Sequence, residues 1–200
     1  QERIWIADFK KIIHEQAKVF GEVPMDAYQF IFLMVPFQMR HAVEHANSAM
    51  FVLPESVVQD TASIRNLYGI TSHEFWHLWN VKRVRPAALW PYDYSREQYT
   101  TLHWFTEGIT DYYAYLALAR AGLNTEEQLM GYLANIIQAL ENGNGQNVQS
   151  PAQSSFESWL APSPYTPPQQ TVSYYTQGAR VGLLLDMAIR QRTDGQSSLD

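Results

Sequence analysis

The most constraining feature of the sequence is the five-residue stretch His73-Glu74-Phe75-Trp76-His77. On an α-helix, residues four positions apart lie one turn apart on the same face, so both imidazoles of this stretch can reach one metal ion. Zinc suits such a site because it accepts neutral imidazole nitrogens and has no geometric preference from its d-electrons. Glu74 stands beside the first histidine, where its carboxylate can take a proton from a water molecule that the metal activates.

The pattern H-E-x-x-H is typical of zinc peptidases, in which the two histidines bind the metal and the glutamate is the general base. The alternative interpretation is an ordinary amphipathic helix whose histidines face solvent or a polar core, because such a short pattern also arises by chance. A peptidase site of this kind requires a third protein ligand and keeps a fourth position for water. The rest of the sequence therefore has to supply one more ligand.

Residues 104–113 contain a second pair of residues at helical spacing. Glu107 and Asp111 are four positions apart, so both carboxylates share a helix face. Glu107 can bind the metal while Asp111 holds a ligating histidine by its other ring nitrogen, which fixes the orientation of the ring. A solvated acidic face is the alternative, but buried carboxylates need partners and the segment is otherwise mostly apolar. Its apolar side chains are Trp104, Phe105, Ile109, Tyr112 and Tyr113.

The composition indicates a folded globular chain and argues against several classes of function. Hydrophobic residues make up 46% and charged residues 17%, which argues for a folded chain and against disorder. A length of 200 residues is enough for one domain with a substantial core, or for two small lobes. A net charge of -6 without a Lys/Arg-rich run argues against nucleic-acid binding. Cysteine is absent, which excludes disulfides and thiolate metal sites. No apolar run approaches the length of a membrane span.

The hydrophobic pattern predicts a mixture of helices and strands. Helices are expected over residues 3–20, 61–80, 100–120, 125–141 and 174–192, and strands over residues 28–37 and 47–53. A polar surface loop is expected over residues 142–155, a helical turn over 156–160 and an extended proline-rich stretch over 162–168. This order predicts an α+β fold in a single domain, 1–200, in which residues 24–60 form a strand-containing cleft wall and residues 61–200 a helical lobe.

Residues 41–45 form the inverted zinc-peptidase pattern H-x-x-E-H and compete with the first motif as a ligand set. This pattern binds metal only when it lies on a helix. His41 and His45 instead lie between two strand-like runs, with Pro36 close upstream. A strand or loop that lines a cleft is therefore the preferred interpretation of this segment.

Residues 72–86, which include His73-Glu74-Phe75-Trp76-His77-Leu78-Trp79-Asn80-Val81-Lys82-Arg83-Val84-Arg85-Pro86, closely resemble the signature of the glycyl aminopeptidase family. This is metallopeptidase family sixty-one, a branch of the gluzincins. Residues 104–113 also resemble its third-ligand motif, and the similarity extends from about Tyr28 to the end of the chain. The resemblance implies a thermolysin-like catalytic domain that is normally followed by a PDZ domain, so the chain is expected to be an excised catalytic fragment.

The resemblance also assigns roles to individual residues. It implies one bound zinc ion with His73, His77 and Glu107 as ligands and Glu74 as the general base. Residues 175–179, Tyr-Thr-Gln-Gly-Ala, resemble a Tyr-Glu-Lys-Gly-Ala segment of the aminopeptidase N relatives, whose tyrosine hydroxyl stabilises the tetrahedral oxyanion. Tyr175 is expected in this role, and the neighbouring tyrosine at position 174 is the alternative.

Glu44 aligns with the glutamate of the family's Gly-Gly-Leu-Glu-His run, which in relatives binds the free amino group of the substrate. The chain departs from the family here, because Arg40-His41-Ala42-Val43 precedes Glu44 and contains no glycine. Glycine permits close approach of a backbone to a ligand, so the peptide is expected to dock differently.

Three functional hypotheses follow from these residues. The first is a zinc aminopeptidase that acts on peptide or protein substrates and releases small N-terminal residues such as glycine or alanine. The second is a zinc endopeptidase. The third is a non-catalytic peptide-binding module that keeps the fold, and the intact Glu74 argues against it, because a binding scaffold needs no general base.

Overall fold

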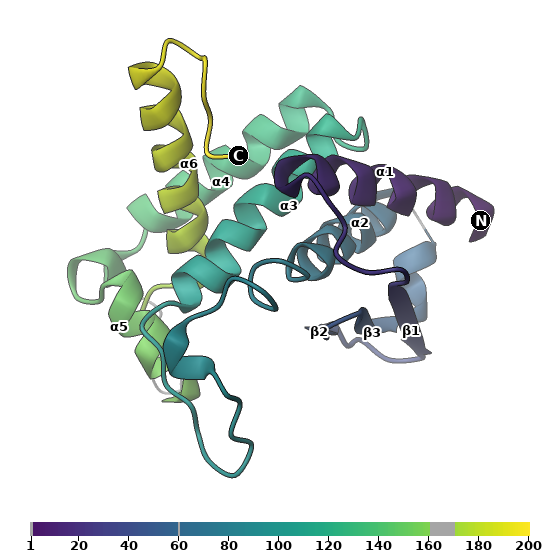
Figure 1. Cartoon of the computed structure of the whole chain (residues 1–200), viewed down its shortest axis with the longest axis horizontal. Helices are drawn as coiled ribbons and strands as arrows, with labels where there is room; N and C mark the ends of the chain where they lie inside the picture. Colours follow the sequence, from purple (N-terminus) through teal and green to yellow (C-terminus); the bar gives the residue numbers. More distant parts are fainter. Residues whose placement is uncertain (1, 60, 161–170) are drawn as a thin grey trace. The chain divides into compact units, whose positions relative to one another are not determined.

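The computed structural model describes residues 2–59, 61–160 and 171–200 (Figure 1). The α-helices are α1 (Glu2–Phe20), α2 (Thr61–Trp76), α3 (Thr110–Arg120), α4 (Glu126–Glu141), α5 (Pro151–Phe156) and α6 (Tyr174–Arg192), and the strands are β1 (Gln29–Val35), β2 (His41–Glu44) and β3 (Ser48–Pro54). A small sheet and a mostly helical remainder confirm the predicted α+β class. Within the described residues, no helix is both long and apolar enough to cross a membrane.

The chain divides into two compact units, and neither is continuous in the sequence. Unit one comprises Gln1–Arg83 and Tyr113–Leu129, and unit two comprises Val84–Tyr112 and Met130–Asp200. The boundaries between the units fall after Arg83, within α3 and within α4. The assignment of residues 1–200 to a single domain stays a prediction.

Unit one is built on a three-stranded sheet in the order β1-β3-β2 (Figure 1). The strand β3 is parallel to β1 and antiparallel to β2. It is also the most buried strand, because Phe51 and Leu53 pack into one core with Ile12 of α1, Leu67 of α2 and Leu118 of α3. The strand β2 coincides with the inverted motif, which confirms that this segment is not a helix.

Residues 142–155 were expected to form a loop, which is wrong, because they contain a 3-10 turn, Asn144–Asn147, and the helix α5. The signal for α5 is the pair Ser150-Pro151. The Ser150 hydroxyl accepts a hydrogen bond from the Gln153 amide at 3.1 Å, and proline suits the first helical position. The predicted turn is observed at Glu157–Leu160, and the extended stretch over 162–168 lies outside the described residues.

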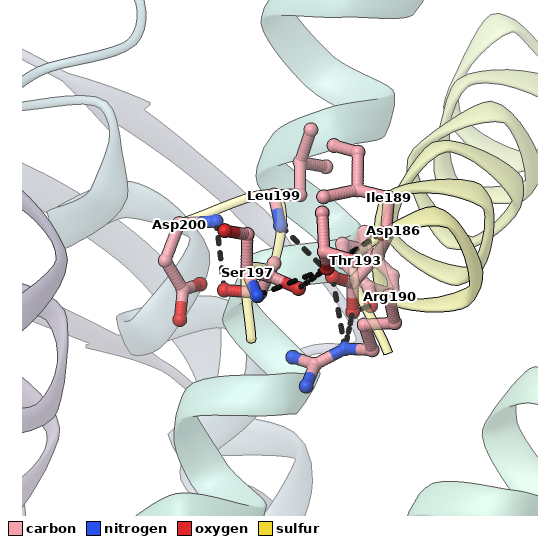
Figure 2. A network of polar contacts seen from close by, with 9 residues as sticks. Asp186, Ile189, Arg190, Thr193, Ser197, Leu199 and Asp200 are labelled. Carbon is pink, nitrogen blue, oxygen red and sulfur yellow. Dashed lines mark hydrogen bonds and ion pairs between the residues drawn. The ribbon is translucent and has the colours of Figure 1, made fainter. Parts of the chain in front are cut away.

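In unit two, Asp186 connects α6 with the start of α3 and with the C-terminal tail. Its carboxylate accepts hydrogen bonds from the Tyr112 hydroxyl at 2.7 Å, the Arg190 Nε at 3.0 Å and the Leu199 amide at 2.9 Å. Figure 2 shows the contacts with Arg190 and Leu199. Burial raises the pKa of the Asp186 carboxyl, but the donors favour its charged form more strongly, so this pKa lies below its ordinary value.

Replacing Asp186 with asparagine is expected to lower the free energy of unfolding by about 1–3 kcal/mol at pH 7, because buried donors lose a charged acceptor. The folded-state pKa lies below the unfolded value of about 3.9, so the carboxylate contributes its full stabilisation above pH 4 and loses it as the pH falls through the folded-state pKa. Urea denaturation at pH 7 and at pH 2 checks this. The exposed Glu97→Gln is the control, and an equal difference between wild type and Asp186→Asn at both pH values would contradict the assignment.

Candidate metal and substrate site

The paired histidines lie at the C-terminal end of α2. This helix ends at Trp76, so the expectation that it continues to Asn80 is wrong by one turn. Just beyond the helix, the amides of Leu78 and Trp79 donate hydrogen bonds to carbonyls three residues back. This turn is therefore tighter than an α-helix. The His77 amide still reaches the His73 carbonyl at 3.4 Å, so the two histidines remain one turn apart on one face.

The two imidazoles converge on one point. Their Nε2 atoms are 3.0 Å apart, and the rings are nearly perpendicular at 84°. The Nδ1 of His77 lies 2.7 Å from the Asn80 carbonyl, which can only accept, so Nδ1 carries the proton and Nε2 of His77 carries a lone pair. The lone pair on the His77 Nε2 faces the His73 Nε2 over this distance. This arrangement is favourable when a cation binds both nitrogens. The buried pair of nitrogens therefore fits a divalent metal of the zinc type.

The other side chains of the motif hold α2 in the core of unit one. Phe75 is fully buried and contacts the Tyr28 ring edge-to-face, with centroids 5.0 Å apart. Trp76 stacks on Tyr113 at 4.1 Å and 11°. Phe75 packs on the face opposite the two histidines and Trp76 packs at the side of the helix, so the helix is held with the two histidines and the intervening glutamate presented together.

A buried polar link positions the residue just before the motif. Gln16 of α1 donates from Nε2 to the Ser72 carbonyl at 2.7 Å and to the Ser72 hydroxyl at 2.8 Å. The Ser72 hydroxyl in turn donates to the Ala114 carbonyl at 2.9 Å. All three residues are fully buried, so losing any of these bonds leaves polar atoms unsatisfied. Sequence reasoning did not identify Gln16, since a single glutamine in an amphipathic helix belongs to no motif.

Glu74, Glu44 and His77 form a second cluster, in which one ligand atom from each residue lies within 4.8 Å of the others. Glu44 is the last residue of β2 and pairs with Ala49 of β3. The Tyr28 hydroxyl donates to the Glu74 carbonyl at 3.4 Å. Burial raises the pKa of Tyr28, and the carboxylates of Glu74 and Glu44 raise it further, so this hydroxyl remains a donor at neutral pH. Sequence reasoning placed Tyr28 in a strand and missed this contact.

Glu44 also forms an ion pair that no sequence motif indicates. The Lys82 ammonium lies 3.2 Å from the Glu44 Oε1, and both side chains are partly buried, at 17% and 23% exposure. The neighbouring Arg83 has a different role, because its Nη1 donates to the Leu78 carbonyl near the end of α2. A cationic side chain at this position is favourable against the helix macrodipole.

In unit two, Glu107 and Tyr175 lie side by side. Glu107 belongs to a π-helical turn, η3 (Trp104–Ile109), and Tyr175 to the first turn of α6. The two segments approach closely at Gly108 and Gly178, where an added Cβ would overlap the opposite backbone. Glycine at both positions therefore allows the Tyr175 hydroxyl to donate a hydrogen bond to the Glu107 carboxylate. The helix expected from Thr100 begins later, with this turn, and π-helical turns are frequent at functional sites.

The electrostatics of this group keep the Tyr175 hydroxyl protonated. Burial raises the pKa of Tyr175, and the charge of Glu107 raises it further, with smaller effects from Tyr174 and Asp111. The Tyr174 ring stacks on Tyr175 at 4.8 Å and contacts the His103 ring at 5.6 Å. Burial lowers the pKa of His103 although Glu107 opposes this shift. The spacing of four between His103 and Glu107 is the sequence signal that could have identified this histidine.

The residues expected from the sequence fall into two groups, each assembled within its own unit. Unit one holds His73, Glu74, His77 and Glu44, and unit two holds Glu107, Asp111 and Tyr175. The first group offers neutral nitrogen ligands and carboxylates, and the second offers a carboxylate and a protonated phenol. These are the donor types that a mononuclear hydrolytic metal site uses.

Comparisons with known proteins agree with this chemistry. The model of the M61 glycyl aminopeptidase family matches residues 66–181, which is more than half of the chain. A crystal structure of an aminopeptidase N family protein from Idiomarina loihiensis superposes with a TM-score of 0.90 at 29% sequence identity. The match covers 97% of this chain and 34% of that chain, so the present chain spans about a third of that protein. Among curated proteins, no sequence matches this chain.

Proposed function

The chain belongs to the M61 glycyl aminopeptidase family, and we propose that it is a zinc-dependent peptidase that releases small N-terminal residues such as glycine or alanine. The observation that carries this proposal is the convergence of the His73 and His77 Nε2 atoms, 3.0 Å apart, next to the carboxylate of Glu74. Glu107 is the proposed third ligand, which leaves a fourth position for substrate or water. A bound zinc ion supplies a Lewis acid that polarises the scissile carbonyl.

The side chains around the metal ligands then have separate tasks. Glu74 is only 6% exposed and takes the proton of the attacking water as general base. Tyr175 donates a hydrogen bond to the tetrahedral oxyanion, which its raised pKa supports because the phenol stays protonated. Tyr174 stacks on Tyr175 and is the alternative donor. The free ammonium of the substrate pairs with the Glu44 carboxylate.

An endopeptidase is the second candidate, and one contact favours it. The carboxylate of Glu44 already has a cationic partner in Lys82 at 3.2 Å, and the glycines that precede the family's glutamate are missing here. Both features weaken the recognition of a free amino terminus. A non-catalytic peptide-binding module is less well supported, because it has no use for Glu74.

The proposal is tested by loading the purified chain with zinc and comparing peptides with free and N-acetylated amino ends. Mass spectrometry identifies the products. Release of single glycine or alanine residues from free peptides is expected. Internal cleavage of both peptide types would instead support the endopeptidase, and no hydrolysis by the zinc-loaded chain would support the binding module.

Glu44→Gln is expected to lower kcat/KM for peptides with a free amino end by about tenfold or more, since a partly desolvated ammonium loses its anionic partner. Hydrolysis of the N-acetylated peptide, however slow, should barely change, because this peptide cannot form the ion pair. Steady-state kinetics on both substrates provide an internal control, since both meet the same metal and Glu74. An equal loss on both substrates would mean that Glu44 supports the site generally.

Asp111→Asn is expected to weaken zinc affinity or activity by about ten- to a hundredfold without unfolding the chain, as loss of an outer hydrogen-bond partner usually does. The proposed role of Asp111 is to hold a ligating histidine by its second ring nitrogen. Zinc competition with a chelating dye measures the affinity, and thermal unfolding monitors the fold. A variant equal to wild type in zinc affinity and activity would show that Asp111 has no role at the metal.

A further inference from the structure

The ion pair between Lys82 and Glu44 places a cation of the chain beside the carboxylate proposed to receive the substrate. The Lys82 Nζ lies 3.2 Å from the Glu44 Oε1. The same carboxylate has an oxygen within 4.8 Å of ligand atoms of Glu74 and His77. The lysine ammonium thus lies at the amino-end side of the proposed reaction centre, where a free substrate ammonium would also have to bind.

The backbone on both sides of this ion pair is held in place. The Lys82 amide donates to the His77 carbonyl at 3.0 Å, so the lysine belongs to the same turn as the second histidine of the motif. Glu44 is paired with Ala49 in the sheet. Both side chains are less than a quarter exposed, so solvent screens the pair less than it screens an ion pair on an open surface.

We propose that Lys82 is a specificity-determining residue that lowers the preference of the site for free amino termini. The inference rests on the proposed peptidase function. A substrate ammonium has to share Glu44 with the Lys82 ammonium, and two like charges at one carboxylate repel each other. A blocked or internal peptide segment has no charge at this point and is not disfavoured by Lys82. Lys82 therefore shifts the chain toward blocked or longer substrates, compared with a site in which Glu44 has no cationic partner.

A second explanation makes Lys82 purely structural. Its ammonium lies beside the Glu44 carboxylate, which is itself close to Glu74, and would then only stabilise these two neighbouring carboxylates. In that case, removal of the charge disturbs the site equally for every substrate. The ratio of kcat/KM for a free glycyl peptide to kcat/KM for its N-acetylated form distinguishes the two explanations, because a general disturbance cancels in the ratio.

The experiment compares Lys82→Met, which removes the charge and keeps an apolar stem, with Lys82→Arg, which keeps the charge. Lys82→Met is expected to raise the ratio about tenfold, and Lys82→Arg to leave it within about twofold of wild type. In the double variant Lys82→Met/Glu44→Gln, the ratio should equal that of Glu44→Gln alone, since the lysine acts through this carboxylate. An unchanged or lowered ratio in Lys82→Met would overturn the proposal.

A binding measurement separates failure of this inference from failure of the proposed function. If the zinc-loaded wild type hydrolyses neither peptide, the proposed function fails, and calorimetry then measures the binding of the same two peptides to wild type and Lys82→Met. A gain of about tenfold in affinity for the free peptide alone would still support the role of Lys82. Equal affinity changes for both peptides, or no change, would overturn it.

Discussion

Glu74→Gln is expected to keep its zinc and to lose nearly all peptide hydrolysis, by about 10²–10⁴-fold in kcat. Glutamine preserves the shape of the side chain but cannot accept the proton of the attacking water. The residue is buried beside the paired histidines, and no other carboxylate on α2 is available to replace it. The loss should therefore appear in kcat on every cleavable peptide, irrespective of the amino end.

The control for this variant is Glu22→Gln, which makes the same chemical change at an exposed position. It should match wild type in both turnover and zinc content. Intact-mass analysis of the Glu74→Gln preparation excludes contamination by wild type. Near-normal turnover in a clean preparation would show that Glu74 is not the general base.

The second large effect concerns the proposed ligands. His73→Ala, His77→Ala and Glu107→Ala are each expected to lose most of the bound zinc. The loss of zinc affinity should exceed the roughly ten- to hundredfold that is typical when an outer hydrogen-bond partner is removed, because each of these variants removes one of three direct ligands. Hydrolysis should fall with the zinc content. Elemental analysis after dialysis measures the metal, starting from about one zinc per wild-type chain.

A matched control for the histidine variants is His14→Ala, which changes an exposed histidine of α1. Its zinc content should equal that of wild type. Full metal retention in any one of the three ligand variants would remove that residue from the ligand set. Loss of zinc only together with loss of cooperative unfolding would point to damage of the fold.

Local sequence patterns predicted the elements of the fold well. Helical periodicity identified α1 and α6 to within a residue or two, and apolar runs bounded by proline identified β1 and β3. The position of the inverted motif between two strand-like runs, with Pro36 close upstream, predicted a strand or loop, and the segment is the strand β2. Each of these predictions depends on neighbours within one or two turns of the chain. The missed helix α5 had its own local signal at Ser150-Pro151, which the polar composition of the segment obscured.

Contacts between distant residues were not predictable in this way. Gln16 and Ser72 are 56 positions apart, and their buried hydrogen bonds follow from the packing of α1 on α2. The close approach of Gly108 and Gly178 likewise depends on how α6 meets the π-helical turn. Glycine permits such an approach but does not indicate its partner.

The sequence by itself determined that His73 and His77 share one face, because residues four apart on a helical turn lie one above the other. Only the tertiary structure decided which groups meet that face. It placed the Lys82 ammonium beside the Glu44 carboxylate, 38 positions away in the sequence. The physical reason is that helix geometry is local, whereas the pairing of a strand residue with a residue beyond the end of a helix depends on how the sheet and the helix pack.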